Sequence, residues 1–455
     1  MITWGLPLWK IAPLYIVCFI YFCWITYKCH KDDFANLLIL LFMFGLWSFL
    51  GKTMVNVMRI VTLLYAFYIA FQYKIFNIQR TPVKKIFIIS GVFFVYYFLV
   101  SFLLNHDAPT IIFSQLSRYV ICFIVYMVFY KISTSNAKIL YNYNTLFLYL
   151  FLLQIIITIF KIILIGQFEP IVGSISYNGG AMGTTIPLLA LLWLSINTNQ
   201  NFSKWTWLFM FAMMMVGFAS SKRAVWVIVP GIFILYAFFV VKKKIGNTLK
   251  ILFAIAPLLF YFGLRVTPTL NPDNKIWGRF DPEYAWNYAI DYSMGKEDSE
   301  GDRGEGSGRV GGVKLLVNNY LLNWDAYFDI HNVLGHGNQY IFAAAYDNYR
   351  NVDYYFGVDH QGSLTGVFRI WIAIGTIGMV LIIIFILSFF RTIRYKRLKI
   401  LLIGVIMFDY IFYSGTIIHE PGLLATYMYI IFLATFQYDS NGRFLAYNKI
   451  IEGKQ

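Results

Sequence analysis

The sequence predicts an all-α polytopic integral membrane protein with about 12–14 transmembrane helices and one large outer (periplasmic or extracellular) loop that carries short helices. The 455 residues are 59% hydrophobic and 13% charged, with a mean hydropathy of +0.64. A single soluble core could not bury so much apolar surface. Apolar runs close to the roughly 20 residues needed to cross a bilayer recur along the chain. Basic residues gather in every second connection between these runs, as they do in multi-pass membrane proteins.

Each apolar run is expected to form a helix, because the hydrocarbon interior offers backbone N–H and C=O groups no partner outside their own segment. The expected spans are residues 9–27, 34–50, 54–73, 86–104, 110–130, 145–165, 181–197, 205–219, 224–241, 249–264, 365–390, 398–414 and 421–437.

The basic residues predict the orientation of the chain, since positive charge is concentrated on the inner side of a membrane. They are Lys74, Arg80, Lys84, Lys85, Lys131, Lys138, Lys204, Lys242, Lys243, Lys244, Lys250, Arg391, Arg394, Lys396, Arg397 and Lys399, with Arg443, Lys449 and Lys454 in the tail. This pattern places the C-terminus inside and residues 265–364 outside. The net charge of +15 therefore indicates membrane topology, and no nucleic acid is expected as a partner.

The chain then divides into three parts. Residues 1–264 are expected to form an N-terminal transmembrane bundle of about ten helices, and residues 265–364 a large outer loop with short surface helices. Residues 365–455 supply C-terminal transmembrane helices and a cytoplasmic tail. The outer loop holds most of the acidic residues of the chain, so any chemistry is expected in it or against it.

Within the outer loop, residues 266–308 are rich in turn residues and end in an acidic run with many glycines. Residues 309–346 regain helical character, because Val313, Leu316 and Tyr320 form an apolar stripe. This short helix is expected to lie along the membrane surface.

Several cations fall inside the apolar runs, where each costs roughly 2.5–3.5 kcal/mol on insertion scales. They are Arg59, Arg118, Lys161, Arg265 and Arg369, all in the outer halves of their spans. Lys161 and Arg265 are as consistent with snorkelling to the outer interface as with burial. Arg59 and Arg118 lie deeper, which favours a polar cavity. With Arg223 they would form an outward-facing cationic chamber suited to an anionic headgroup.

The glycine-rich stretch at residues 173–185 precedes a short span. Its backbone amides could cradle a phosphate at a helix start. The same residues are ordinary in a flexible outer loop, and the sequence leaves both interpretations open.

Three motifs resemble those of the O-antigen polymerase and O-antigen ligase family of bacterial surface-polysaccharide assembly. Residues 220–223 (Ser-Ser-Lys-Arg) resemble the Ser-Arg element of the family. Residues 307–309 (Ser-Gly-Arg), followed by residues 332–337 (Asn-Val-Leu-Gly-His-Gly), resemble its Gly-Arg helix and Leu-Gly-x-Gly turn. Residues 359–360 (Asp-His), before a helix with glycines at 375 and 378, resemble its His-containing element and Gly-x-x-Gly.

The resemblance departs from the family pattern at two positions: Lys222 intrudes in the first motif, and Gln361 stands where the family has Asn. It covers about residues 205–390 and implies a glycosyltransferase in the bacterial inner membrane, with its active site facing the periplasm or exterior. Such enzymes move a glycan from an undecaprenyl-diphosphate carrier to an acceptor hydroxyl. A polymerase that joins lipid-linked repeat units of O-antigen, capsule or exopolysaccharide, with or without a chain-length regulator protein, is the first hypothesis. A ligase that transfers finished polymer is the second, and a flippase or exporter of the lipid-linked oligosaccharide is the third.

Cations carry the expected chemistry, because a diphosphate leaves readily once its charge is countered. Arginine binds phosphate oxygens with a planar fork and keeps its charge. Arg223 and Arg309 are assigned to catalysis and to the diphosphate, with Lys222, Arg118 and Arg369 as supports and Arg59 as a secondary candidate.

The attacking hydroxyl needs a base, and histidine has a suitable pKa near neutral pH. His360 is the first candidate, with Asp359 and His336 as secondary candidates; a cap or headgroup contact is an equally good interpretation of His360. His331 and His419 are interpreted as structural. Asp107 stands alone among the early outer loops, so the sequence predicts no metal site, no cofactor and an inverting, metal-independent transfer.

Overall fold

The computed structural model describes the greater part of the expected spans. The described residues are 8–28, 32–50, 52–77, 81–135, 137–165, 171–175, 181–198, 203–219, 224–236, 257, 260–294, 309–338, 364–413 and 415–437. Within these ranges every regular element is a helix and none is a strand. The all-α fold is therefore confirmed for the described part of the chain.

The described helices lie on the expected apolar runs and on the outer loop. The α-helices are α1 (Leu8–Lys28), α2 (Asp33–Phe42), α3 (Lys52–Gln72), α4 (Thr81–Leu99), α5 (Pro109–Ser135), α6 (Ala137–Ile165), α7 (Met182–Thr198), α8 (Lys204–Ala219), α9 (Ala224–Tyr236), α11 (Pro282–Met294), α12 (Arg309–Leu316), α13 (Ile330–Leu334), α16 (Gly366–Ser388), α17 (Lys396–Phe412), α18 (Thr416–His419) and α19 (Pro421–Gln437). Shorter 3-10 or π segments are η1 (Phe44–Leu50), η2 (Val100–Leu104), η5 (Pro268–Leu270), η6 (Val317–Leu321), η7 (Trp324–Phe328) and η8 (Phe389–Thr392). The expected span at 249–264 lies largely outside the described residues.

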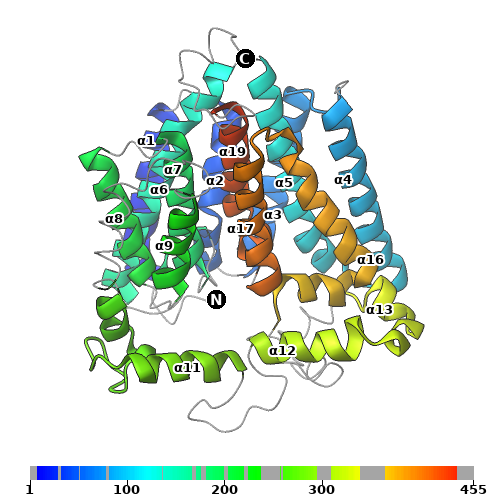
Figure 1. Cartoon of the computed structure of the whole chain (residues 1–455). Coiled ribbons are helices and arrows are strands. Elements are labelled where there is room, and N and C mark those ends of the chain that lie inside the picture. The colour runs from blue at the N-terminus through cyan, green and yellow to red at the C-terminus, as the bar shows by residue number, and fades with distance from the viewer. Residues whose placement is uncertain are drawn as a thin grey trace.

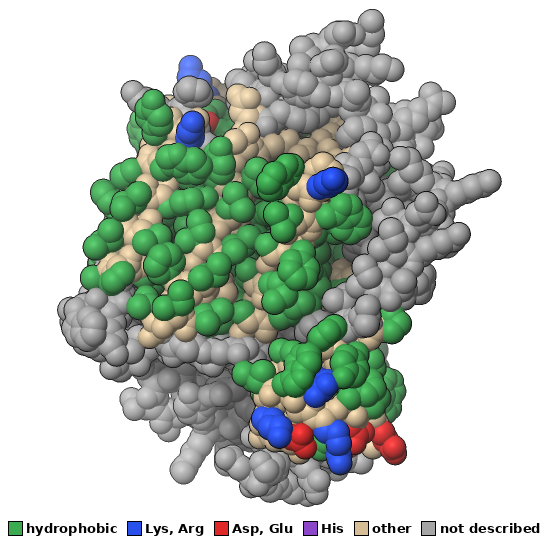
Figure 2. Space-filling model, turned by 90° about the vertical axis from the view of Figure 1, so that its left-hand side faces the viewer, with side chains coloured by type: hydrophobic (Ala, Val, Ile, Leu, Met, Phe, Trp, Pro, Cys, Tyr) green, Lys and Arg blue, Asp and Glu red, His purple; other side chains and the backbone are tan. Residues whose placement is uncertain are grey.

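Five described helices are long and apolar enough to cross a membrane: Met54–Gln72, Val83–Leu104, Pro109–Ser133, Asn142–Leu164 and Gly366–Thr392. Many apolar side chains are exposed on the outside of the bundle, and Figure 2 shows one broad hydrophobic face with few Lys and Arg, most of them toward its upper and lower ends. The chain is thus an α-helical membrane protein. The full set of 12–14 spans and their orientation stay predictions.

The long helices stand side by side, and α11 and α12 lie across one end of this bundle (Figure 1). We call the end that carries α11, α12 and α13 the polar end. The opposite end carries the exposed basic residues that flank the helices, among them Lys74, Lys84, Arg394 and Arg397, and we call it the basic end. These basic connections therefore lie at the same end of the described bundle, and the side of a membrane that this end faces stays a prediction.

The helices α5, α7 and α19 form the centre of the bundle. α19 packs closely on both α5 and α7, and nearly every residue of α7 and α19 is buried. Both helices are apolar on all sides, which is the pattern of a helix surrounded by others. One continuous core extends from Leu14 to Ala434, so the C-terminal helices pack among the N-terminal ones.

The expected span at 365–390 is present as α16, but this helix has a break that the sequence did not predict. Ile374 and Gly375 have non-helical backbone angles, and Gly375 has φ 68° and ψ −173°. Before the break α16 runs along the polar end, and after it the helix crosses the bundle (Figure 1). Glycine at the break is required, since other residues rarely adopt a positive φ.

Snorkelling of Lys161 to the outer interface is also wrong. Its side chain is buried in the bundle, and Nζ donates to the Gly173 carbonyl at 2.6 Å. The Gly173 N–H donates to Thr158 Oγ1 and the Ser174 N–H to Gln154 Oε1. These amides are used within the bundle, so residues 173 and 174 do not form a phosphate cradle or a free loop.

The outer segment is more helical than its turn-rich sequence predicts. α11 occupies residues that we expected to be a loop, while α12 begins at the expected residue 309 and continues into the π segment η6. Arg265 donates to the Gly278 carbonyl at 2.9 Å and lies 4.6 Å from the Trp277 ring centroid. It therefore fixes the first turn of the outer segment.

Candidate functional site

Two glycines bring the starts of α16 and α18 into contact at the polar end. A Cβ added to Gly366 would lie 2.8 Å from the Gly415 Cα, and the Gly366 N–H donates to the Tyr413 carbonyl at 3.1 Å. Arg369 and His419 each follow one of these glycines by about one helical turn. The glycine contact therefore places a guanidinium and an imidazole in the same small region.

Arg118 of α5 reaches the same region. It lies close enough to His419 for its charge to act on the imidazole, as does Arg369. Burial of the imidazole is the main reason that the pKa of His419 lies well below its ordinary value of 6.5, and the positive charges of Arg118 and Arg369 lower it further. The imidazole is therefore neutral at pH 7, and the region carries the positive charge of the guanidinium groups.

Three buried polar atoms belong to residues at or beside the contact between Gly366 and Gly415. His419 Nε2, the Tyr410 hydroxyl and Thr365 Oγ1 are buried and make no hydrogen bond to the part of the chain that the structure describes. The Tyr410 ring packs against the glycine contact, with Cδ2 2.8 Å from a Cβ built on Gly366. Buried polar groups are normally satisfied, so this cluster is suited to a polar ligand.

Arg118 has the strongest signature of a ligand contact. Its side chain is half-buried, and its guanidinium makes no hydrogen bond or ion pair with another described residue. Arg59 of α3 donates to Ser114 Oγ at 2.5 Å, and Ser114 lies one turn before Arg118 on the same face of α5. The two arginines are thus neighbours, while Arg223, the third member of the predicted cationic chamber, lies outside the described residues. We call Arg59, Arg118, Arg369 and His419 the cationic cluster.

A buried polar network beside the cluster ties the outer segment to the bundle. Asp107 Oδ2 accepts from the Asn338 backbone N–H at 2.8 Å and from Asn338 Nδ2 at 2.9 Å. Asn338 Oδ1 accepts from the Tyr97 hydroxyl at 2.6 Å, and Nδ2 also donates to Ser101 Oγ. All four residues are at most 2% exposed. Asp107 thus anchors a residue more than two hundred positions away.

Removing the Asp107 carboxylate is expected to loosen this anchor. Asp107→Ala leaves the buried Asn338 backbone N–H without its acceptor and removes one of the two acceptors of Asn338 Nδ2, which should destabilise the docked segment by about 3 kcal/mol. Hydrogen exchange at the amides of residues 335–338 should rise strongly. Asp325→Ala, which removes an exposed carboxylate from the same outer segment, is the control and should change nothing; equal protection in both variants would contradict the anchoring role.

The glycine motifs of the outer segment and of α16 interlock. The His336 N–H donates to the Ile372 carbonyl at 2.7 Å and the Gly337 N–H to the Ala373 carbonyl at 3.1 Å. These carbonyls precede the break in α16 and so need partners outside their own helix. A Cβ on Gly335 would lie 2.4 Å from the Ala373 carbonyl oxygen. Parts of two of the three motifs, the Leu-Gly-x-Gly turn and the first glycine of Gly-x-x-Gly, therefore form one structural unit.

His336 lies beside this unit. The Nε2 atom of His336 is 3.0 Å from Asn332 Oδ1. The Asn332 Nδ2 group donates to the Ala326 carbonyl, so Asn332 Oδ1 is the acceptor toward His336. The proton of the imidazole is therefore on Nε2. Burial is the main cause that lowers the pKa of His336 to about 4, and the charge of His331 lowers it further. The imidazole is neutral at pH 7, as a base requires.

This lowered pKa predicts that acid weakens the docked segment. The unfolded segment binds a proton near pH 6.5 and the docked one only near pH 4, so its stability is complete above pH 6.5 and falls as the pH drops toward 4. The full loss is about 3 kcal/mol at about 1.4 kcal/mol per pH unit. Protection factors of residues 330–338, corrected for intrinsic exchange, should fall between pH 7.5 and 5. His336→Gln should abolish this pH dependence; an unchanged dependence would show that another group is responsible.

The structure brings together some of the residues that the sequence selects. Arg118 and Arg369 join in the cationic cluster, with Arg59 next to them. Arg309 begins α12, and its side chain lies outside the described residues, as do Lys222, Arg223, Asp359 and His360. From the sequence we interpreted His419 as structural and did not select Tyr410. The signal that could have pointed to this region is the polar Gly-Thr-Ile-Ile-His-Glu segment at residues 415–420, between two apolar runs.

Groups of three or more His, Cys, Asp or Glu that could hold a metal do not occur among the described residues. The chain matches no protein-family model, no curated protein and no solved structure. The family resemblance stays a prediction.

Proposed function

We propose that the chain is a membrane glycosyltransferase that joins oligosaccharide repeat units carried on undecaprenyl diphosphate at the polar end of the bundle. The observation that supports this most is Arg118, a half-buried guanidinium without a described protein partner, next to Arg369 and a neutral His419. A lipid diphosphate would supply an anion for the Arg118 guanidinium. The same chemistry would serve a polymerase of O-antigen, capsule or exopolysaccharide in the bacterial inner membrane.

In this mechanism the cations stabilise the charge that grows on the departing diphosphate. Arg118 and Arg369 bind the phosphate oxygens, with Arg59 beside them, and the Arg223, Lys222 and Arg309 side chains selected from the sequence complete the set. Each such contact in a water-poor site is worth about 3–4 kcal/mol to the transition state.

The acceptor hydroxyl attacks the anomeric carbon as the bond to the diphosphate oxygen breaks, and a base takes the hydroxyl proton. His360 or Asp359 fills this role in the proposal, and the neutral His336 is the described alternative. The transfer uses no metal and inverts the anomeric centre; isolation of a covalent glycosyl-enzyme would overturn this part.

The test is mass spectrometry of lipid-linked glycans in a strain that lacks the gene. Single repeat units that accumulate on the outer face support the polymerase. Long lipid-linked polymer indicates the ligase, which would share the same site. Single units retained on the inner face indicate the flippase and overturn the catalytic proposal.

Binding can be tested separately with farnesyl diphosphate, a soluble lipid diphosphate, on the purified protein. Each charge-assisted hydrogen bond contributes about 1.5–3 kcal/mol, so loss of Arg118 should weaken binding by at least about tenfold. Equal affinity of wild type and Arg118→Ala would place the diphosphate elsewhere.

A further inference from the structure

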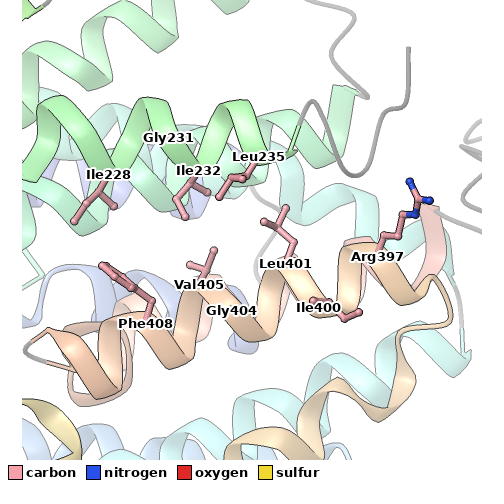
Figure 3. Close-up of a pocket in the computed structure, with 10 residues that line it drawn as sticks. All are labelled: Ile228, Gly231, Ile232, Leu235, Arg397, Ile400, Leu401, Gly404, Val405 and Phe408. Atoms are coloured by element: carbon pink, nitrogen blue, oxygen red, sulfur yellow. The ribbon is translucent and has the colours of Figure 1, made fainter. Parts of the chain in front are cut away.

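An apolar groove of about 930 Å³ runs between α9 and α17. Ile228 and Ile232 of α9 face Leu401, Val405 and Phe408 of α17 across it, as Figure 3 shows. The two helices make few direct contacts along this length. The groove is separate from the cationic cluster, and the proposed reaction does not use it.

Glycines widen the groove on both sides. Gly231 of α9 and Gly404 of α17 line it, and a Cβ added to either would meet no atom within 4 Å. By contrast, Gly366 and Gly415 are pressed together, and there the missing side chains allow close packing. At Gly231 and Gly404 the missing side chains leave space among the described residues.

The length of the groove matches one leaflet of a bilayer. Along α17 it extends from Arg397 to Phe408, which is about 16 Å at 1.5 Å per residue. This is close to half of the roughly 30 Å hydrocarbon thickness. Arg397 is exposed at the basic end of the bundle, where the headgroups of one leaflet would lie.

We propose that the groove binds an acyl chain of an anionic glycerophospholipid from the leaflet at the basic end, with Arg397 on its phosphate. The apolar walls suit a hydrocarbon chain, and a guanidinium matches a phosphate in charge and geometry. A lipid of the opposite leaflet would bring its headgroup toward Phe408 instead, where the groove offers no charge. The length and the charge thus select the same lipid.

Photo-crosslinking in vesicles tests this site. The protein is reconstituted in phosphatidylcholine that contains a trace of phosphatidylglycerol with a diazirine on its acyl chain, and labelled peptides are identified by mass spectrometry. Label on residues 228–235 and 400–408 should exceed that on the exposed face of α4, represented by Ile88 and Val92, severalfold. Gly404→Leu should fill the groove and reduce the label severalfold. Arg397→Gln should remove the preference for phosphatidylglycerol over a diazirine phosphatidylcholine.

Gly91→Leu is the matched control. Gly91 lies within α4, a Cβ there also meets nothing within 4 Å, and its label should equal that of the wild type. Gly231→Leu blocks the groove from the other helix if Gly404→Leu does not fold. Groove labelling no stronger than that of α4, labelling that survives both blocks, or an unchanged headgroup preference in Arg397→Gln overturns the proposal. Displacement of the label by farnesyl diphosphate would assign the groove to an isoprenoid and overturn it as well.

Discussion

Arg118→Ala is expected to reduce polymer formation by about 100-fold or more. The guanidinium lies beside Arg369 and the neutral His419, where it would face the charge that develops on the diphosphate. Removal of one such donor from a water-poor site typically costs 10²–10³ in rate. The measurement is the ratio of polymer to single repeat units in a strain that carries the variant as its only copy.

The Arg118 variant should still fold, because its guanidinium makes no hydrogen bond or ion pair with other described residues. Size-exclusion chromatography in detergent checks this. Arg118→Lys keeps the charge but loses the planar fork, so it should be intermediate.

Arg279→Ala is the control for a change of charge at the polar end. Arg279 is exposed, and its Nη2 lies 3.8 Å from Asp281 Oδ2, an arrangement of little energetic weight. Its polymer should match that of the wild type. Wild-type polymer in a folded Arg118→Ala protein would remove Arg118 from the site.

Gly375→Ala is expected to disrupt the docking of the outer segment on α16 and to abolish activity with it. A Cβ on Gly375 would lie 2.2 Å from the Val333 carbonyl oxygen and 2.5 Å from the Gly335 N, far inside contact distance and against backbone that cannot turn aside. The positive φ of 68° adds further strain. The combined cost should exceed about 4 kcal/mol.

Thermal unfolding in detergent and hydrogen exchange at residues 332–338 measure this effect. Gly91→Ala in α4 and Gly404→Ala in α17 are matched controls, since both glycines lie within helices and an added Cβ meets nothing. They should be neutral or slightly stabilising, because alanine is the better helix former. If Gly375→Ala behaves like these controls, the interlocked glycine motifs do not hold the outer segment.

Local pattern was sufficient to predict most of the described helices in the apolar runs. The apolar runs of α3, α4, α5 and α6 are continuous and long. Whether lipid or protein surrounds such a run, its backbone N–H and C=O groups must pair within the segment, and this requires a helix. The cations Arg118 and Arg369 could also be selected in advance, because charge inside an apolar run is costly and needs a reason. What local pattern did not predict was the break at Gly375, since a single glycine in an apolar run is also compatible with a continuous helix.

Contacts between distant residues were not predictable in this way. Asp107 accepts hydrogen bonds from Asn338, and Tyr96 donates to the Ile374 carbonyl, yet nothing in the spacing of these residues indicates that they meet. Lys161 was as compatible with a lipid interface as with the interior until its contact with Gly173 was seen. Such pairs depend on which helices become neighbours, and hydrophobic pattern alone does not specify neighbours in a bundle whose helices are apolar on most sides.

The sequence by itself determined the α-helical membrane class, the approximate positions of most described helices and which arginines fall inside apolar runs. The physical reason is that two requirements apply to each segment separately: its backbone N–H and C=O groups must be paired within the hydrocarbon, and a charged side chain there costs free energy. Only the tertiary structure decided that Gly366 meets Gly415, and that His419 therefore joins Arg118 and Arg369 at one place. That contact brings the backbones of the two glycines so close that neither position has room for a side chain. The packing of α16 against α18 sets this distance, and neither segment sets it alone.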